Sequence, residues 1–270
     1  MLGFGEVAER LRRSTVQVFA GGRREGRGSG VIWQPDGLII TNAHVVSSKQ
    51  AQVELWDGRR VEARLASLDP RRDLAALRVT ASSLPAASPC DPATVRPGEL
   101  VIAIGTPLGF AGALTTGVIH SIDRHHIRAA VRLAPGNSGG PLANVKGEVV
   151  GINTAIWNGL GLAVPSQHVV EFLRYGARPR LGIELRPVTA GGRLGLLILG
   201  VEPGGPADAA SLRTGDILVG VNGRPLASID DLSDALDHGP ATLRLQFVRG
   251  DPNRVRETVA QLPVRIEAAA

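Results

Sequence analysis

The feature that most constrains the fold is a succession of short, β-prone segments in the first two-thirds of the chain. They are rich in valine and isoleucine, several alternate apolar with polar residues, and Gly, Pro or Asp turns separate them. The candidate strands are 14–20, 29–33, 38–41, 51–55, 60–67, 74–79, 99–104, 115–122, 147–154 and 160–164. Numerous short strands at even spacing are typical of sandwiches and barrels, and the strand–helix alternation of a parallel sheet is missing. The pattern therefore predicts a mostly β, antiparallel fold.

A change of pattern near residue 175 predicts a second domain. Ser166 is a suitable N-cap for a helix over 167–174, and the Gly- and Pro-containing stretch that follows has the composition of a linker. Beyond the linker we expect one helix and four strands, at 229–236, 196–201, 217–221, 243–248 and 257–262. The predicted organisation is a first domain, a linker, a smaller α+β domain and a tail, at 1–175, 176–180, 181–265 and 266–270.

The charge pattern argues against nucleic acid as a partner. The formal net charge is +5 and the pI is about 10.5. Nearly all the positive charge is arginine, since Lys49 and Lys146 are the only lysines. Nucleic-acid binders more often show a long basic run or aromatic residues that stack on bases, whereas these arginines are scattered and aromatic residues make up only 3% of the chain. We therefore expect a solvated, arginine-rich surface and no nucleic-acid partner.

Three absences bear on the compartment. The single cysteine, Cys90, rules out an internal disulfide framework. No stretch approaches the 18 or so uninterrupted apolar residues of a membrane span, and no apolar signal-peptide segment follows the first residues. We expect no transmembrane segment, a cytoplasmic location if the chain is complete, and an extracytoplasmic one if an N-terminal targeting segment has been removed.

Three segments carry residues suited to hydrolysis. His44 ends an Asn-Ala-His run, Asp73 opens Asp-Leu-Ala-Ala-Leu, and Ser138 is the serine of Gly-Asn-Ser-Gly-Gly. A serine hydroxyl is a poor nucleophile that needs a base to take its proton, and the base needs an acid to fix its tautomer. Histidine suits the base role because it titrates near neutral pH. The order His, Asp, Ser is that of chymotrypsin-type hydrolases, so these residues are predicted to form a catalytic triad.

The residues around the predicted nucleophile suit a site that stabilises negative charge. Attack on a carbonyl creates an oxyanion, which needs backbone N–H donors aimed at it. The predicted donors are the N–H groups of Gly136, Asn137 and Ser138, with Gly136 providing the turn that aims them. Gly139 and Gly140 are expected to let substrate approach without a Cβ in the way.

With these residues in place, the chain resembles the HtrA/Deg family of trypsin-like serine proteases with PDZ domains. The segments that carry the resemblance are 28–30, 41–46, 73–77, 105–109, 135–142, 151–154 and 161–166, followed by the C-terminal domain. The resemblance implies a chymotrypsin-like double antiparallel β-barrel with six strands in each barrel. It places His44 and Asp73 in the first barrel and Ser138 in the second. It also implies an ATP-independent endopeptidase that degrades unfolded or damaged polypeptides and assembles as a homotrimer.

No metal or cofactor is predicted. The family that the chain resembles is metal-free. The adjacent His125 and His126 would point to opposite faces of a strand, and no set of cysteines or carboxylates accompanies them as metal ligands.

The resemblance also implies where the substrate side chain binds. In the family, the residue five before the serine lines the S1 pocket together with residues of the loop after Gly-Ile-Asn-Thr. These positions hold Leu133, Trp157 and Leu160, so an apolar pocket with a loose preference for aliphatic residues is expected. Only one of Arg132 and Leu133 can face the pocket, because side chains alternate along a strand. An inward Arg132 would instead favour acidic residues.

Two departures from the family pattern leave a second interpretation open. The stretch 128–134 lacks the acidic residue and the asparagine that usually precede the nucleophile loop, with Ala130 and Ala134 in their places. The loops at 121–128 and 156–160 are also shorter than in most relatives. The alternative is a PDZ-based peptide-binding or chaperone-like protein whose protease site is dormant.

The C-terminal domain resembles a PDZ domain. The run Leu181-Gly182-Ile183 is similar to the loop that binds a peptide carboxylate, and a bound peptide C-terminus would add a strand beside Ile183. Leu232 and Leu236 lie four residues apart on the predicted helix and are expected to face the groove, although a core position is open for both. Apolar C-terminal residues are the expected ligands.

Overall fold

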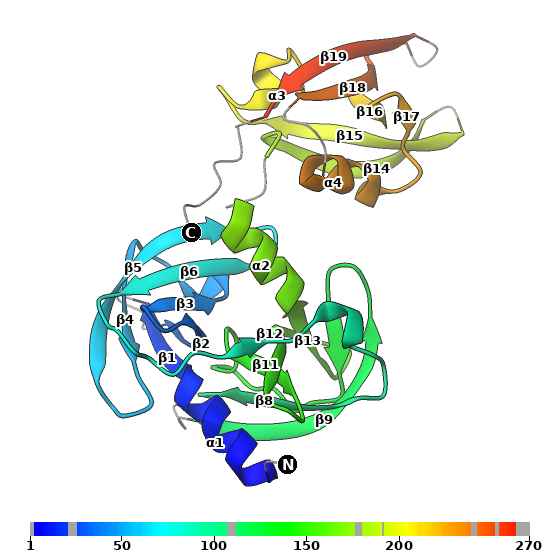
Figure 1. Cartoon of the computed structure of the whole chain (residues 1–270). Coiled ribbons are helices and arrows are strands. Elements are labelled where there is room, and N and C mark those ends of the chain that lie inside the picture. The colour runs from blue at the N-terminus through cyan, green and yellow to red at the C-terminus, as the bar shows by residue number, and fades with distance from the viewer. Residues whose placement is uncertain are drawn as a thin grey trace. The chain divides into compact units, whose positions relative to one another are not determined.

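The first six strands close into a barrel in this computed structural model. They are β1 (Thr15–Ala20), β2 (Gly26–Gln34), β3 (Leu38–Thr41), β4 (Gln50–Glu54), β5 (Arg60–Asp69) and β6 (Leu74–Val79). The strand order is β1-β2-β3-β6-β5-β4, closed by the pairing of β4 with β1, and every pair is antiparallel (Figure 1). A short turn of 3₁₀ helix at Ala43–Val45 follows β3 and carries His44.

The later strands of the same unit form a second barrel. They are β7 (Ser88–Pro89), β8 (Leu100–Gly105), β9 (Ala113–Ile122), β10 (Ile127–Ala129), β11 (Pro141–Asn144), β12 (Glu148–Trp157) and β13 (Leu160–Pro165). The order β11-β8-β9-β10-β13-β12 returns to β11, so six strands make a ring, and β7 adds to β12 in parallel. The two six-stranded antiparallel barrels confirm the predicted fold class.

A shared core joins the two barrels, and strand alternation explains how. In β3, Ile39 packs inside the first barrel, whereas Leu38 and Ile40 face the other way, into a cluster shared with the second barrel. The same cluster receives β6, β12, β13 and the helix α2 (Ser166–Tyr175), which Figure 1 shows beside β6 and β12. Phe172 of α2 is 1% exposed within it. The helix therefore packs against both barrels.

The first helix, α1 (Phe4–Ser14), lies against the second barrel. Its Val7 and Leu11, four residues apart on one face, are buried in a cluster with Ile102, Ile104 and Ala143. No helix was expected at 4–14 from the sequence. Its remaining face is charged and exposed.

Among the residues that the structure describes, the second unit is a six-stranded sheet with two helices. Its strands are β14 (Ile183–Ala190), β15 (Arg193–Val201), β16 (Ile217–Val221), β17 (Arg224–Pro225), β18 (Thr242–Val248) and β19 (Val255–Gln261). The order is β14-β15-β16-β18-β19, with β17 paired to β16. The helices are α3 (Pro206–Ala209) and α4 (Ile229–His238). This unit has a hydrophobic core of its own.

The structure describes residues 3–20, 26–106, 112–175, 180–190, 192–238, 242–251 and 254–262. Its contacts divide the chain into two compact units, separated in the region of residues 177–178. Residues 176–179 of the predicted linker, the predicted tail 266–270 and part of the 105–109 motif lie outside these ranges. No helix among the described residues is long and apolar enough to cross a membrane.

Candidate active site

His44 and Asp73 form a hydrogen-bonded pair on the first barrel. The ring Nδ1 of His44 lies 2.8 Å from Asp73 Oδ2, and the backbone N–H of His44 donates to Asp73 Oδ1 at 3.0 Å. The 3₁₀ turn after β3 and the turn before β6 place the two residues side by side. The two bonds fix both the position and the orientation of the imidazole, with its Nε2 left for another partner.

Two further residues hold the Asp73 side chain and backbone. The hydroxyl of Thr154, on β12 of the second barrel, donates to Asp73 Oδ2. The side-chain amide of the fully buried Asn42 donates to the Asp73 carbonyl oxygen at 2.8 Å. The φ of Asp73 is +54°, in the left-handed region that few non-glycine residues adopt. These contacts hold a conformation that the isolated turn would not favour.

The electrostatics of the pair suit a general base with an ionised partner. The Asp73 hydrogen bond raises the pKa of His44 above its ordinary value, although partial burial of the ring acts in the opposite direction. Burial acts to raise the pKa of Asp73, but hydrogen bonds from His44 and Thr154 outweigh it and hold that pKa below its ordinary value. Asp73 is therefore charged at neutral pH and stabilises the protonated form of His44.

Ser138 lies on a glycine-rich loop that is anchored to the first barrel. Its carbonyl oxygen accepts from the Ser29 N–H at 2.8 Å, and the Ser29 hydroxyl donates to the Gly136 carbonyl oxygen at 2.7 Å. Gly136 has φ +104°, which explains the glycine there. The N–H of Asn137 donates to Ala134 O at 3.0 Å. Within the described residues the N–H groups of Gly136 and Ser138 have no acceptor, which leaves these two donors for an oxyanion.

The nucleophile hydroxyl and the base are not hydrogen-bonded to each other in this structure. Ser138 Oγ donates instead to the Thr154 carbonyl oxygen at 3.1 Å, and the described hydrogen bonds include none between Ser138 and the His44 ring. Thr154 thus contacts both sides of the site, through its hydroxyl to Asp73 and through its carbonyl to Ser138. Hydrogen bonds between a nucleophile and its base are often long or poorly aligned until substrate binds.

The two glycines after the nucleophile have a different structural reason from the one expected. A Cβ on Gly139 would lie 2.0 Å from Ser29 O and 2.3 Å from Thr41 Oγ1. One on Gly140 would lie 2.2 Å from Ile104 O. Contact with the protein's own backbone therefore requires these glycines, whether or not substrate approaches them.

Comparisons with known proteins identify both domains. A family model described as a trypsin-like peptidase domain matches residues 28–152, and one described as a PDZ domain matches residues 197–249. A putative serine protease HhoB from Synechocystis is 36% identical over 253 residues, which cover 80% of this chain and 61% of the relative. A probable periplasmic serine endoprotease, DegP-like, from Chlamydia pneumoniae is 34% identical over 270 residues, with 88% and 55% covered.

The chain belongs to the HtrA family of serine proteases. The matched regions span about 55–61% of the length of these two relatives. A serine endoprotease from Yersinia pestis, known from a crystal structure, aligns with a TM-score of 0.75 and 28% identity over 98% of both chains. The HtrA-type protease AlgW with a decapeptide aligns with a TM-score of 0.77 and 23% identity over 99% of this chain and 100% of that one. The latter shows the likeness of the fold alone.

The residues predicted for the S1 pocket of this HtrA chain differ in how far they are buried. Leu133 is half-buried against the core of the second barrel, with its Cδ1 2.9 Å from where a Cβ on Gly161 would lie, and Arg132 is exposed. Leu160 is half-buried beside Gly161. Trp157 pairs with Leu160 across the turn between β12 and β13, but its side chain is 53% exposed, with the Arg128 guanidinium over the ring.

The predicted peptide-binding residues of the second HtrA unit come from the start of β14 and from α4. Gly182 has φ +71°, and Ile183 begins β14, which is an edge strand in the described sheet order. An edge strand has one side open to a further strand. Leu181 is fully buried. Leu232 and Leu236 of α4 are 4% and 2% exposed and belong to the hydrophobic core of the unit.

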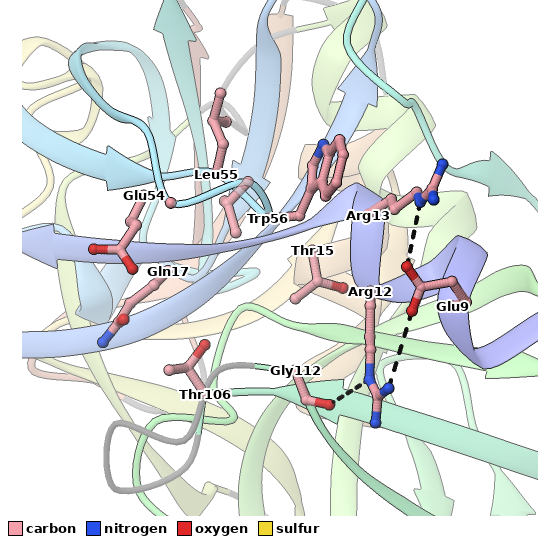
Figure 2. Close-up of a pocket in the computed structure, with 12 residues that line it drawn as sticks. Glu9, Arg12, Arg13, Thr15, Gln17, Glu54, Leu55, Trp56, Thr106 and Gly112 are labelled. Atoms are coloured by element: carbon pink, nitrogen blue, oxygen red, sulfur yellow. Dashed lines mark hydrogen bonds and ion pairs between the residues drawn. The ribbon is translucent and has the colours of Figure 1, made fainter.

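A cavity of about 230 Å³ lies between α1, β1 and the turn after β4 (Figure 2). None of the described lining residues is His44, Asp73 or Ser138. At its wall, Thr106 donates its N–H to Ser29 Oγ at 2.9 Å, and that hydroxyl bonds the nucleophile loop. Figure 2 shows Glu9 between two arginines at the rim, so the charges there are paired.

Sequence reasoning missed the residues that connect the triad. Ser29, Asn42 and Thr154 all lie in segments that carried the HtrA resemblance, but no role was assigned to them. Their position in those motifs was the available signal. The partners that their side chains reach are distant in sequence, so only the fold reveals the contacts.

Proposed function

We propose that the chain is an ATP-independent serine endopeptidase that degrades unfolded or damaged polypeptides through an acyl-enzyme at Ser138. The observation that supports this most directly is the 2.8 Å hydrogen bond between His44 Nδ1 and Asp73 Oδ2, which leaves Nε2 for the nucleophile. Family membership and the trypsin-like domain match support the reaction class.

In the proposed mechanism, Ser138 Oγ turns from the Thr154 carbonyl toward His44 Nε2, which takes its proton during attack on the scissile carbonyl. The N–H groups of Gly136 and Ser138 bind the oxyanion. Asp73 stabilises the imidazolium, which then protonates the leaving amine. Water, activated by the same imidazole, hydrolyses the acyl-enzyme and restores the serine.

We also propose which substrates and partners the chain binds. Leu133 and Leu160 support a loose preference for cleavage after aliphatic residues, because an apolar wall distinguishes side chains weakly. Trp157 contributes to this pocket only if its exposed side chain turns inward on substrate binding. The open edge of β14 supports capture of peptide C-termini by strand addition. A homotrimer is proposed from the family alone.

Two observations favour the alternative of a dormant protease that acts by binding. The Ser138 hydroxyl is hydrogen-bonded away from the base, and the segment before its loop departs from the family pattern. In that case the second unit would hold client polypeptides, and the triad would stay unreactive until a change at the nucleophile loop.

Labelling with a fluorophosphonate distinguishes the two functions. A competent protease labels at Ser138, and the label appears in the peptide that contains it, whereas the Ser138→Ala variant stays unlabelled and loses casein hydrolysis. A dormant site labels at the background rate of that variant, and both proteins then suppress aggregation of an unfolded client equally. Casein hydrolysis that survives in Ser138→Ala would refute the nucleophile assignment.

A further inference from the structure

A buried ion pair connects the residue next to the catalytic aspartate with the helix between the barrels. Arg72 immediately precedes Asp73, and its Nη2 lies 2.7 Å from Oε2 of Glu171 on α2. The Arg72 side chain is 8% exposed and that of Glu171 is 22% exposed. The pair joins two segments about a hundred residues apart in sequence, and neither residue belongs to the triad.

The glutamate is held in a fixed place by its helix. Its other carboxylate oxygen accepts a hydrogen bond from the Gln167 side-chain amide at 3.1 Å, one turn earlier. Val169 and Phe172, on either side of Glu171, are 0% and 1% exposed in the core shared by the two barrels. The carboxylate therefore projects from a helix packed in the core, with one oxygen on the Arg72 guanidinium and the other on Gln167.

The turn that carries Asp73 needs an anchor. Its beginning is secured by Asp69, which is 1% exposed and whose Oδ1 accepts from the N–H groups of Arg71 and Arg72. Its end is Asp73 itself, with φ +54°. A left-handed aspartate can relax toward commoner backbone conformations if its neighbours allow it. Relaxation would move the carboxylate away from His44.

We propose that Arg72 is a positioning residue that, through its ion pair with Glu171, holds the turn of Asp73 so that its carboxylate meets His44. The inference rests on the proposed triad. Stabilisation of the fold alone is a weak reason for this ion pair, because a buried pair is often no more stabilising than two apolar side chains of similar size. The planar guanidinium is more pre-organised than the flexible ammonium group that a lysine would place here.

The test removes the pair without leaving a buried charge. In Arg72→Met/Glu171→Met, apolar side chains replace both partners, so the fold is expected to survive, and thermal unfolding checks this. The control is Arg78→Met/Asp36→Met, which removes an ion pair of 2.8 Å on the same barrel whose partners are 44% and 65% exposed. If the first double variant does not fold, Glu171→Gln removes the charge while keeping the shape of the side chain.

The first readout is the pKa of His44, measured by NMR titration in the Ser138→Ala background and assigned by comparison with His44→Ala. Asp73 is the charged group that faces His44 among the described residues, so its displacement is expected to lower this pKa toward the ordinary value. The second readout is turnover of a small ester substrate, for which kcat should fall about ten- to a hundredfold with KM unchanged. The control should match the wild type in both.

Each result has a definite meaning. A folded double variant with the wild-type His44 pKa and wild-type kcat overturns the positioning role. A lowered pKa with reduced kcat supports it. The titration needs no turnover, so the two proposals can fail separately. If the wild-type protein does not label with fluorophosphonate, the proposed function is refuted. If the double variant still shows a lowered His44 pKa, the positioning role stands.

Discussion

The two halves of the candidate active site differ in how completely they are assembled. On the first barrel, His44 and Asp73 are joined by two hydrogen bonds, and Asn42 adds a third contact to the Asp73 backbone. On the second barrel, the Ser138 hydroxyl bonds Thr154 instead of the base, and two loop N–H groups have no acceptor within the part of the chain that is described. His44 and Asp73 are already joined as the mechanism requires, whereas the Ser138 hydroxyl must still turn toward His44.

This difference suggests which half can be switched. The aspartate and histidine are fixed by contacts within the protein, so we expect them to be in place before substrate binds. A rotation of one hydroxyl decides whether the nucleophile meets the base. Substitutions can separate the two halves. Changes at the His44–Asp73 pair should shift the pKa of His44, whereas changes at the Ser138 loop should not.

The largest expected effect is on the acid–base half. Asp73→Asn should lower kcat about 10⁴-fold, because the amide favours the wrong imidazole tautomer. Asparagine tolerates the left-handed backbone of this position, so the turn should persist. Steady-state kinetics measure the loss, and an NMR titration should show the pKa of His44 lowered. Asp36→Asn, on an exposed turn, is the control, and an unchanged kcat in Asp73→Asn would remove Asp73 from the triad.

A smaller loss is expected from the nucleophile half. Gly136→Ala should lower kcat about 10²–10³-fold, the cost of losing an oxyanion donor, because alanine disfavours φ +104° and the loop would turn. The pKa of His44 should stay at its wild-type value. Gly58→Ala is a matched control, since that glycine has φ +83° with open space around its Cβ position. A His44 pKa shifted as far as in Asp73→Asn would break the distinction between the halves.

The pH dependence of the wild type tests the first half without a substitution. The base must be neutral, so kcat/KM should fall about tenfold for each pH unit below the pKa of His44, which lies above its ordinary value of about 6.5. The linked stability has the opposite sign. A raised pKa in the folded state stabilises the fold below the ordinary value, and this contribution is lost as pH rises through the folded-state pKa. An acid limb centred below pH 6 would contradict the assigned pair.

The smallest effect is expected where the halves meet. Thr154→Val removes the hydroxyl that donates to Asp73 and keeps the carbonyl that accepts from Ser138. We expect kcat to fall about three- to tenfold and the pKa of Asp73 to rise, since one hydrogen bond to its charged form is lost. Thr154→Ser should restore both, as measured by kinetics and carboxylate NMR titration. No change in either quantity would mean that the hydroxyl contact is incidental.

Much of the fold could be predicted because the strands have strong local signals. The limits of β3, β6 and β16 are those expected, since each is a short apolar run bounded by turn residues. The missed elements lack such a signal. In α1, the apolar face is hidden among charged residues, and β10 and β11 are only three and four residues long. Their pairing depends on partners elsewhere in the barrel.

The site was predictable to the extent that chemistry restricts residue type. A nucleophile, a base and an acid in a known order predicted a triad, and the structure brings His44 and Asp73 together. The role of Thr154 was not predictable, because many residue types could supply one hydrogen bond. The ion pair of Arg72 was hidden for a similar reason, since charged residues usually lie on the surface and its partner is far along the chain.

The core between the barrels also has a consequence for how the protein is made. Its apolar residues come from early strands, from late strands and finally from α2, the last described element of the first unit. During synthesis His44 and Asp73 leave the ribosome well before Ser138, and Glu171 follows later still. Under the positioning role proposed for Arg72, the turn of Asp73 gains its anchor only after α2 has emerged.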